Sequence, residues 1–302
     1  MLRVCYYNVR PDQKVFKQYG WMLCQNNPMT MTSPVRLHTP PEQHRIAGHA
    51  ALLLICVAAL WLFMLQGRVL ATGWVMLIWM VVTLVMLRGL FLRARIRRRA
   101  WRSAYLYPES SWNRRLRGGL CLFIIQLGKT GVLAAVLLLT VVRIGNEPGL
   151  WRLMLVAVLL FVLARAWADR MFWRDASPAY RPELVARVGQ WGAGVVLVLC
   201  LLLWALVQPQ PDFREATLEQ ALWHVTDREA AVSVAVERGT QWLAAWQGLE
   251  HWVAQQITAL DQPHWIRAGV WVSVLVRQSL FVVSLLVLFN GVLAGRLNDG
   301  GR

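Results

Sequence analysis

Long apolar runs alternate with short polar segments along most of this chain. A helix needs about 20 apolar residues to cross the hydrocarbon core of a bilayer. Six runs reach or approach that length, at 47–66, 69–92, 119–142, 150–167, 191–207 and 268–292. The pattern predicts an all-α, polytopic integral membrane protein with about six transmembrane helices, five of them within residues 47–208 and the sixth within 266–302.

The segment between the fifth and sixth runs, residues 209–265, has a different pattern. Its apolar residues recur at helical spacing on one face, at Trp242, Trp246, Leu249, Val253, Ile257 and Leu260. This spacing predicts an amphipathic insert of about two helices, with Gly239 as a plausible break between them. The apolar stripe must pack against some surface, so Trp242, Trp246, Leu249 and Val253 are candidate contacts with a partner.

Residues 1–46 show neither pattern. Pro34, Pro40 and Pro41 stand among scattered polar residues there, which predicts a loosely ordered tail. Two of the three lysines of the chain also lie in this segment, whereas the remainder uses arginine almost throughout. One hypothesis is that translation starts at Met29 or Met31, so that residues 1–28 are not part of the native protein.

Composition strengthens the membrane assignment, and charge adds an orientation. The chain is 57% hydrophobic and only 16% charged, yet its formal net charge is +16. Soluble domains are about a quarter charged, whereas arginine-rich loops on the cytoplasmic side are typical of polytopic membrane proteins. We therefore expect a multi-pass protein of the inner (plasma) membrane.

Loop charges set the predicted orientation. The loop 93–118 contains nine arginines and a single acid, Glu109, so the positive-inside rule places it in the cytoplasm. Both termini then also lie in the cytoplasm. The insert 209–265 contains eight acidic residues and three arginines, which fits the extracytoplasmic side.

The arginine run at the start of loop 93–118 could do more than set the topology. Each Lys or Arg close to an anionic membrane surface contributes about 1 kcal/mol of attraction. Candidate contacts with anionic lipid headgroups are Arg93, Arg95, Arg97, Arg98, Arg99 and Arg102. Topology alone is the simpler explanation of this run, and nucleic acid is not an expected partner.

Two cations fall deep inside predicted spans. Lys129 lies about 15 Å into the third span and Arg277 about 13.5 Å into the sixth, at 1.5 Å per residue. No Asp or Glu lies inside any of the six runs, and an ionisable residue at such depth is a functional candidate. Gln126, Thr130 and Gln278 add polar groups beside them.

Three interpretations of these cations stay open. They could line a pathway for an anion between the third and sixth spans, or pair with an acid on another membrane protein. Alternatively, a shift of the helix or snorkelling of the long side chains leaves them purely structural.

Signatures of catalysis are absent from the sequence. Gly128-Lys129-Thr130 resembles the end of a phosphate-binding loop, but that motif needs a glycine at 123, where Phe123 stands. The six histidines and five cysteines show no metal-ligand or disulfide spacing, so no metal or other cofactor is expected.

The sequence favours a non-enzymatic subunit or scaffold of an envelope assembly of the secretion, conjugation or export type. Its expected partners are the lipid bilayer and other membrane proteins or further copies of itself. The alternative is a transporter or channel for an anionic solute that uses Lys129 and Arg277.

Overall fold

The computed structural model describes residues 42–105, 119–145, 149–173, 175–176, 180–207, 211–259 and 264–294. These residues form eight α-helices and no strand. The predicted tail 1–46 lies outside the described residues up to residue 41, as do residues 106–118 of the predicted loop 93–118 and the C-terminal residues 295–302.

Six of the helices contain segments long and apolar enough to cross a membrane. Helices suit apolar surroundings because they satisfy their backbone N–H and C=O groups internally. The six helices are α2 (Glu42–Gln66), α3 (Thr72–Tyr105), α5 (Leu120–Ile144), α6 (Leu150–Met171), α7 (Arg181–Val207) and α10 (His264–Ala294). The protein is therefore an all-α, multi-pass membrane protein, as the apolar runs predicted.

Two helices extend ten or more residues beyond the predicted spans. Helix α3 continues through the arginine run to Tyr105, so the start of the predicted loop 93–118 is helical. This part of the prediction was wrong because arginine has good helix propensity and the apolar run marks only the lipid-compatible part of a helix. Helix α7 likewise begins at Arg181, ten residues before its predicted span.

Between α7 and α10 lie α8 (Leu218–Thr226) and α9 (Val234–Ala259). Thr217 caps α8 with a capping box to Gln220. The predicted break at Gly239 is wrong, because Gly239 lies inside α9 and the two helices are separated by residues 227–233. A Cβ on Gly239 would lie 2.7 Å from the Leu139 side chain, so this glycine lets α9 approach α5 closely.

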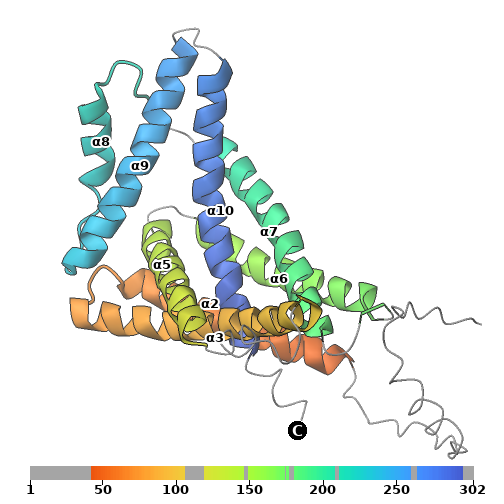
Figure 1. Ribbon diagram of the computed structural model, residues 1–302. Helices are drawn as coiled ribbons and strands as arrows, with labels where there is room; N and C mark the ends of the chain where they lie inside the picture. Colours follow the sequence, from red (N-terminus) through yellow and green to blue (C-terminus); the bar gives the residue numbers. More distant parts are fainter. Residues whose placement is uncertain are drawn as a thin grey trace, which may run out of the picture. The chain divides into compact units, whose positions relative to one another are not determined.

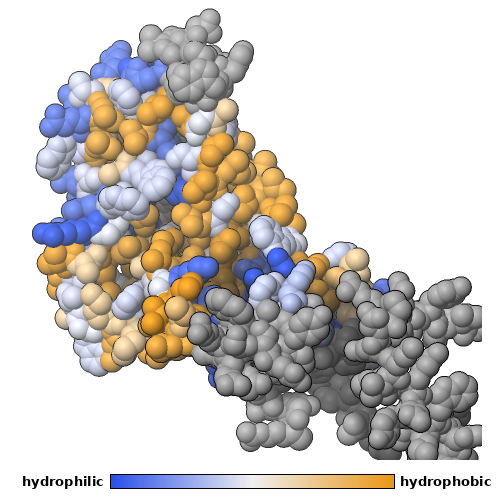
Figure 2. Space-filling view, in the orientation of Figure 1, coloured by the Kyte–Doolittle hydropathy of each residue, from blue (hydrophilic) through white to orange (hydrophobic). Residues whose placement is uncertain are grey.

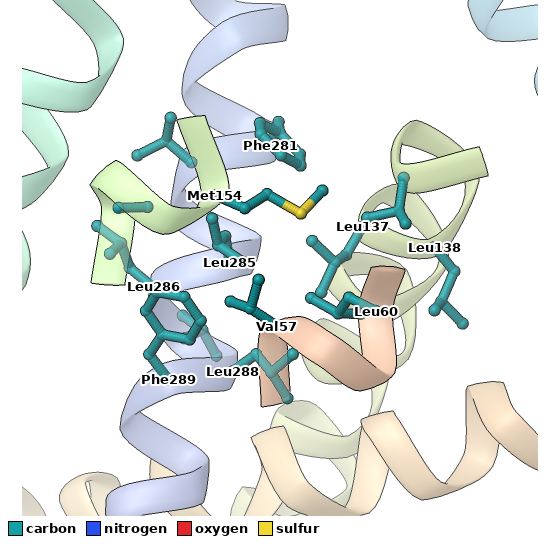
Figure 3. Packing of buried hydrophobic residues seen from close by; sticks show 14 of the residues in the cluster. Val57, Leu60, Leu137, Leu138, Met154, Phe281, Leu285, Leu286, Leu288 and Phe289 are labelled. Atoms are coloured by element: carbon teal, nitrogen blue, oxygen red, sulfur yellow. The ribbon is translucent and has the colours of Figure 1, made fainter. Parts of the chain in front are cut away.

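Helix α10 forms the centre of the packing. Within its span 44% of the residues are buried, against 17–28% in the other five. Its second half carries Phe281, Leu285 and Phe289, which pack with residues of α2, α5 and α6 such as Leu60 (Figure 3). Burial of apolar side chains on several faces of one helix explains why α10 is apolar nearly all round.

Helix α9 packs against α10, α5, α3 and α8. It runs beside the first half of α10, to which the chain leads directly (Figure 1). Figure 2 shows hydrophilic residues gathered over α8 and the adjoining part of α9, and a hydrophobic surface over α7 and α10. The insert therefore presents a polar surface, whereas the neighbouring spans present an apolar one.

Candidate functional site

Arg277 of α10 has an acidic partner within the chain. Its Nε donates to Oε2 of Glu250 at 2.9 Å, and Glu250 is buried. The hydroxyl of Ser273 donates to the other carboxylate oxygen at 2.8 Å and accepts from the indole N–H of Trp246 at 3.0 Å. No acid lies inside the six apolar runs, and the partner of Arg277 comes instead from the insert, because α9 brings its carboxylate alongside α10.

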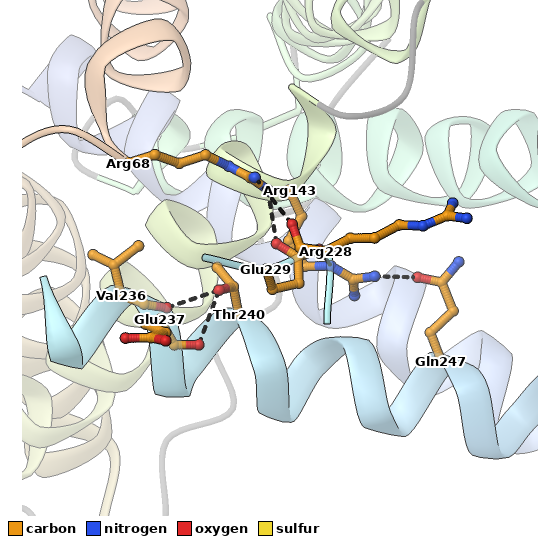
Figure 4. Close-up of polar contacts among 8 residues, drawn as sticks. All are labelled: Arg68, Arg143, Arg228, Glu229, Val236, Glu237, Thr240 and Gln247. Carbon is orange, nitrogen blue, oxygen red and sulfur yellow. Dashed lines mark hydrogen bonds and ion pairs between the residues drawn. The ribbon is translucent and has the colours of Figure 1, made fainter. Parts of the chain in front are cut away.

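A second buried carboxylate of the insert, Glu229, lies between two arginines (Figure 4). Nη2 of Arg68 is 2.7 Å from Oε2, and Nε of Arg143 is 3.2 Å from Oε1. Nη2 of Arg143 also donates to Oε1 of Gln247 on α9 at 2.8 Å. Arg68 follows α2 and Arg143 ends α5, so Glu229 joins the insert to two membrane helices.

One backbone and one side-chain hydrogen bond reinforce this attachment. The N–H of Val232 donates to the carbonyl of Arg68 at 2.9 Å, and the hydroxyl of Thr72 donates to that of Ser233 at 3.1 Å. The segment between α8 and α9 thus lies on the α2–α3 turn. Removing one partner of a buried ion pair destabilises a protein by about 3–5 kcal/mol, because the other charge is left without compensation.

A cavity of about 250 Å³ lies beside these ion pairs. It is bounded by residues of α5, α6, α7, α9 and α10 together with Pro211, and its polar lining comprises Thr140, Arg143, Trp204, Gln247, His251, Arg277 and Gln278. Burial lowers the pKa of His251 from its usual value, and the nearby Arg277 and Arg143 lower it further, against the opposing effect of Glu250. The imidazole is therefore neutral at pH 7, and the arginines provide the cavity's positive charge.

Lys129 does not join Arg277. It is exposed on α5, fourteen residues before Arg143, which places it about 21 Å along the helix from the arginine that does line the cavity. Thr130 is buried, and its hydroxyl donates to the carbonyls of Gln126 and Leu127 in its own helix. Of the predicted intramembrane residues, Arg277 and Gln278 belong to the cavity, whereas Gln126, Lys129 and Thr130 do not.

Some arginines of α3 contact other helices, and some are exposed. Arg93 donates to Gln190 at 2.9 Å and lies 3.9 Å from Glu183, while Arg97 lies 3.6 Å from the same carboxylate. Arg95 and Arg97 are exposed and Arg98 is half-buried. The side chains of Arg99 and Arg102 lie outside the described residues. Arg93 therefore joins α3 to α7, which the lipid-contact hypothesis did not anticipate.

The residues of the insert's apolar stripe also differ in their exposure. Trp246 and Val253 are half-buried, and Trp246 contacts α10 through Ser273. Trp242 and Leu249 are exposed, and the Trp242 ring packs edge-to-face on Trp246 with centroids 5.3 Å apart. Part of the stripe thus packs within the chain, and part is available to another molecule.

An open groove of about 810 Å³ lies between α8 and α9. Its apolar lining includes Trp223 and Trp242, which are 64% and 63% exposed. Its charged residues are Glu219, Asp227, Glu237 and Arg238. Three acids against one arginine give the groove a net charge of −2, so it combines exposed aromatic surface with negative charge.

Sequence reasoning missed most of the cavity. It also missed the ion pairs beside the cavity, since Arg68 lies in a short turn and Arg143 ends α5, whereas Glu229 and Glu250 belong to the acidic insert. Opposite charges concentrated in segments expected on the same side of the membrane could have suggested the pairing. Among the described residues, no group of three His, Cys, Asp or Glu side chains could hold a metal ion.

These features define a multi-pass α-helical membrane protein whose insert is attached to its membrane helices through buried ion pairs. Comparisons with protein-family models, with curated proteins and with solved structures find no match to this chain.

Proposed function

We propose that this protein is a non-enzymatic subunit of an inner-membrane assembly, of the secretion, conjugation or export type, that binds a partner through its extracytoplasmic insert. The groove between α8 and α9 carries this proposal, because two largely exposed tryptophans line it outside the candidate spans. Exposed tryptophans are common at the centres of protein interfaces. On the spans themselves, lipid accounts for exposed apolar side chains.

The charge of the groove specifies the partner. Glu219, Asp227 and Glu237 outnumber Arg238, and opposite charges across an interface favour the correct partner and speed its association. The occupant is therefore a segment of another membrane protein that carries basic residues next to an apolar or aromatic side chain. The ion pairs of Glu229 and Glu250 give the insert a defined position from which to hold that segment.

Site-specific photo-cross-linking in native membranes tests this function. A photoreactive amino acid in place of Trp223 is expected to give a protein adduct whose cross-linked peptide, mapped by mass spectrometry, is basic and apolar. Charge reversal by Asp227→Lys with Glu237→Lys should reduce the adduct by at least about ten-fold, the effect of losing roughly 1.4 kcal/mol of binding energy.

The matched control places the same photoreactive residue at Trp191, which is 69% exposed on the span of α7. This site should yield lipid adducts and no charge-dependent protein adduct. If position 223 gives only lipid adducts, or a protein adduct indifferent to charge reversal, the groove does not hold such a partner.

The anion pathway through Lys129 and Arg277 receives less support. The two residues do not share a cavity, and Glu250 compensates the charge of Arg277. No observation favours a continuous path between them.

A further inference from the structure

We propose that the cavity between α5, α7, α9 and α10 binds a small oxyanion, through a phosphate or carboxylate group. The proposal is independent of the partner groove, which lies between α8 and α9 and shares no lining residue with the cavity. It also differs from the anion pathway considered from sequence, because Arg143 and not Lys129 accompanies Arg277.

The distribution of charge around the cavity favours an anion. Arg143 and Arg277 line it, and no Asp or Glu among the described residues does. The carboxylates that contact these arginines, Glu229 and Glu250, are not part of the lining. Arg68 also contacts Glu229, so the ion pairs among the described residues beside the cavity join three arginines to two glutamates.

Hydrogen-bond donors remain available around the same space. Arg277 uses Nε for Glu250, and its two terminal nitrogens form no hydrogen bond with any described residue. A guanidinium has five N–H donors in a planar fork that suits oxyanions. The terminal nitrogens can therefore bind an oxyanion while the ion pair with Glu250 remains intact.

Trp204 provides a second, independent indication. Its indole nitrogen is buried and has no hydrogen-bond partner within the described part of the chain. An indole nitrogen is only ever a donor, and a buried donor without an acceptor destabilises the fold. An oxyanion in the cavity that Trp204 lines supplies acceptor oxygens, which neither a cation nor an apolar ligand does.

The cavity has room for such a ligand. A water molecule occupies about 30 Å³ in the liquid, so about 250 Å³ can hold a phosphate group with part of the molecule that carries it. Gln278 and Thr140 line the same space and form no hydrogen bond with other described residues. A soluble phosphate compound and a lipid headgroup share this chemistry, and binding measurements can separate the two sources.

Full-length protein in nanodiscs provides the test. In the first experiment the discs contain only phosphatidylcholine, and inorganic phosphate is titrated by isothermal calorimetry. In the second, phosphatidylglycerol is added to the discs without phosphate, and retention of lipid through purification is measured by mass spectrometry. Saturable phosphate binding identifies a soluble oxyanion as ligand, and selective retention of phosphatidylglycerol identifies a headgroup.

Three variants link either signal to the cavity. Gln278→Glu places a carboxylate in the lining and should abolish binding, whereas Trp204→Phe keeps the ring, removes the N–H and should weaken binding about ten-fold. Lys129→Gln is the control, because it removes an exposed cation outside the cavity and should leave binding unchanged.

Thermal unfolding of each variant confirms that it remains folded. The proposal is overturned if neither experiment detects binding to the wild-type protein. It is equally overturned if Gln278→Glu binds as well as wild type, or if Lys129→Gln weakens binding as much as Gln278→Glu does.

Discussion

Glu229 and Glu250 are the residues on which attachment of the insert depends most. Each is a buried carboxylate that contacts at least one arginine of the membrane region. A buried charge is stable only when it is paired and hydrogen-bonded. Neutralising either glutamate therefore removes a charged partner of a half-buried arginine.

Glu229→Gln should destabilise the protein more than Glu250→Gln. Glu229 contacts both Arg68 and Arg143, whereas Glu250 forms an ion pair with Arg277 and a hydrogen bond with Ser273. We expect a loss of about 3–5 kcal/mol for Glu229→Gln, measured as a shift in thermal unfolding of the detergent-solubilised protein.

The control for this comparison is Glu219→Gln, at an exposed position in the first turn of α8. Exposed substitutions usually change stability by less than about 0.5 kcal/mol. Equal unfolding temperatures for the Glu219 and Glu229 variants would contradict a buried ion pair at Glu229.

At the scale of helices, the crossing of α3 and α10 depends on two glycines. A Cβ on Gly89 would lie 2.9 Å from Cα of Gly291, and a Cβ on Gly291 would overlap the carbonyl oxygen of Val85. Small residues at both positions allow the two backbones to approach closely. Gly291 of α10 thus lies directly against the backbone of α3.

Gly291→Ala is expected to destabilise the protein by about 1–3 kcal/mol, because the added methyl group meets backbone that cannot move independently. Unfolding in denaturant or by heat measures the change. Gly128→Ala on α5 is the matched control, since a Cβ there meets nothing within 4 Å.

The control should be neutral or stabilise α5 by up to about 1 kcal/mol, because alanine has the higher helix propensity. A Gly291→Ala protein as stable as the Gly128→Ala protein would mean that α3 and α10 do not cross this closely.

At the scale of the whole molecule, the contacts group the loops at opposite ends of the spans. The insert contacts the α2–α3 turn through Arg68 and the end of α5 through Arg143. The second half of α3 contacts the start of α7, through Glu183 with Arg93 and Arg97. The loop charges predict the same grouping.

Labelling of single cysteines in a cysteine-free background tests the orientation. If the insert lies outside the cytoplasm, Trp223→Cys should react with a membrane-impermeant maleimide in cells whose outer membrane is permeabilised and whose inner membrane is sealed. Tyr105→Cys, at the exposed end of α3, should react only after the inner membrane is also permeabilised. Reaction of both residues before permeabilisation would contradict the predicted orientation.

Much of this architecture could be predicted from the sequence because it depends on local properties. Whether a helix can cross the membrane depends on some 20 consecutive residues, so all six spans were found, although α7 begins ten residues before its predicted start and α3 continues well past its predicted end. The charge of a loop is equally local, and it distinguished the acidic insert from the arginine-rich segments. Single residues such as Arg277 and Gln278 could also be recognised as unusual in an apolar span.

Only the tertiary structure decided what these residues contact. The glutamate beside Arg277 is 27 residues away in the chain, and the one beside Arg68 is 161 residues away. Such pairs depend on how α9 packs against α10 and α5, which no local pattern encodes. The sequence therefore determined which segments cross the membrane and where charge is concentrated, whereas packing between distant helices determined the ion pairs, the cavity and the groove.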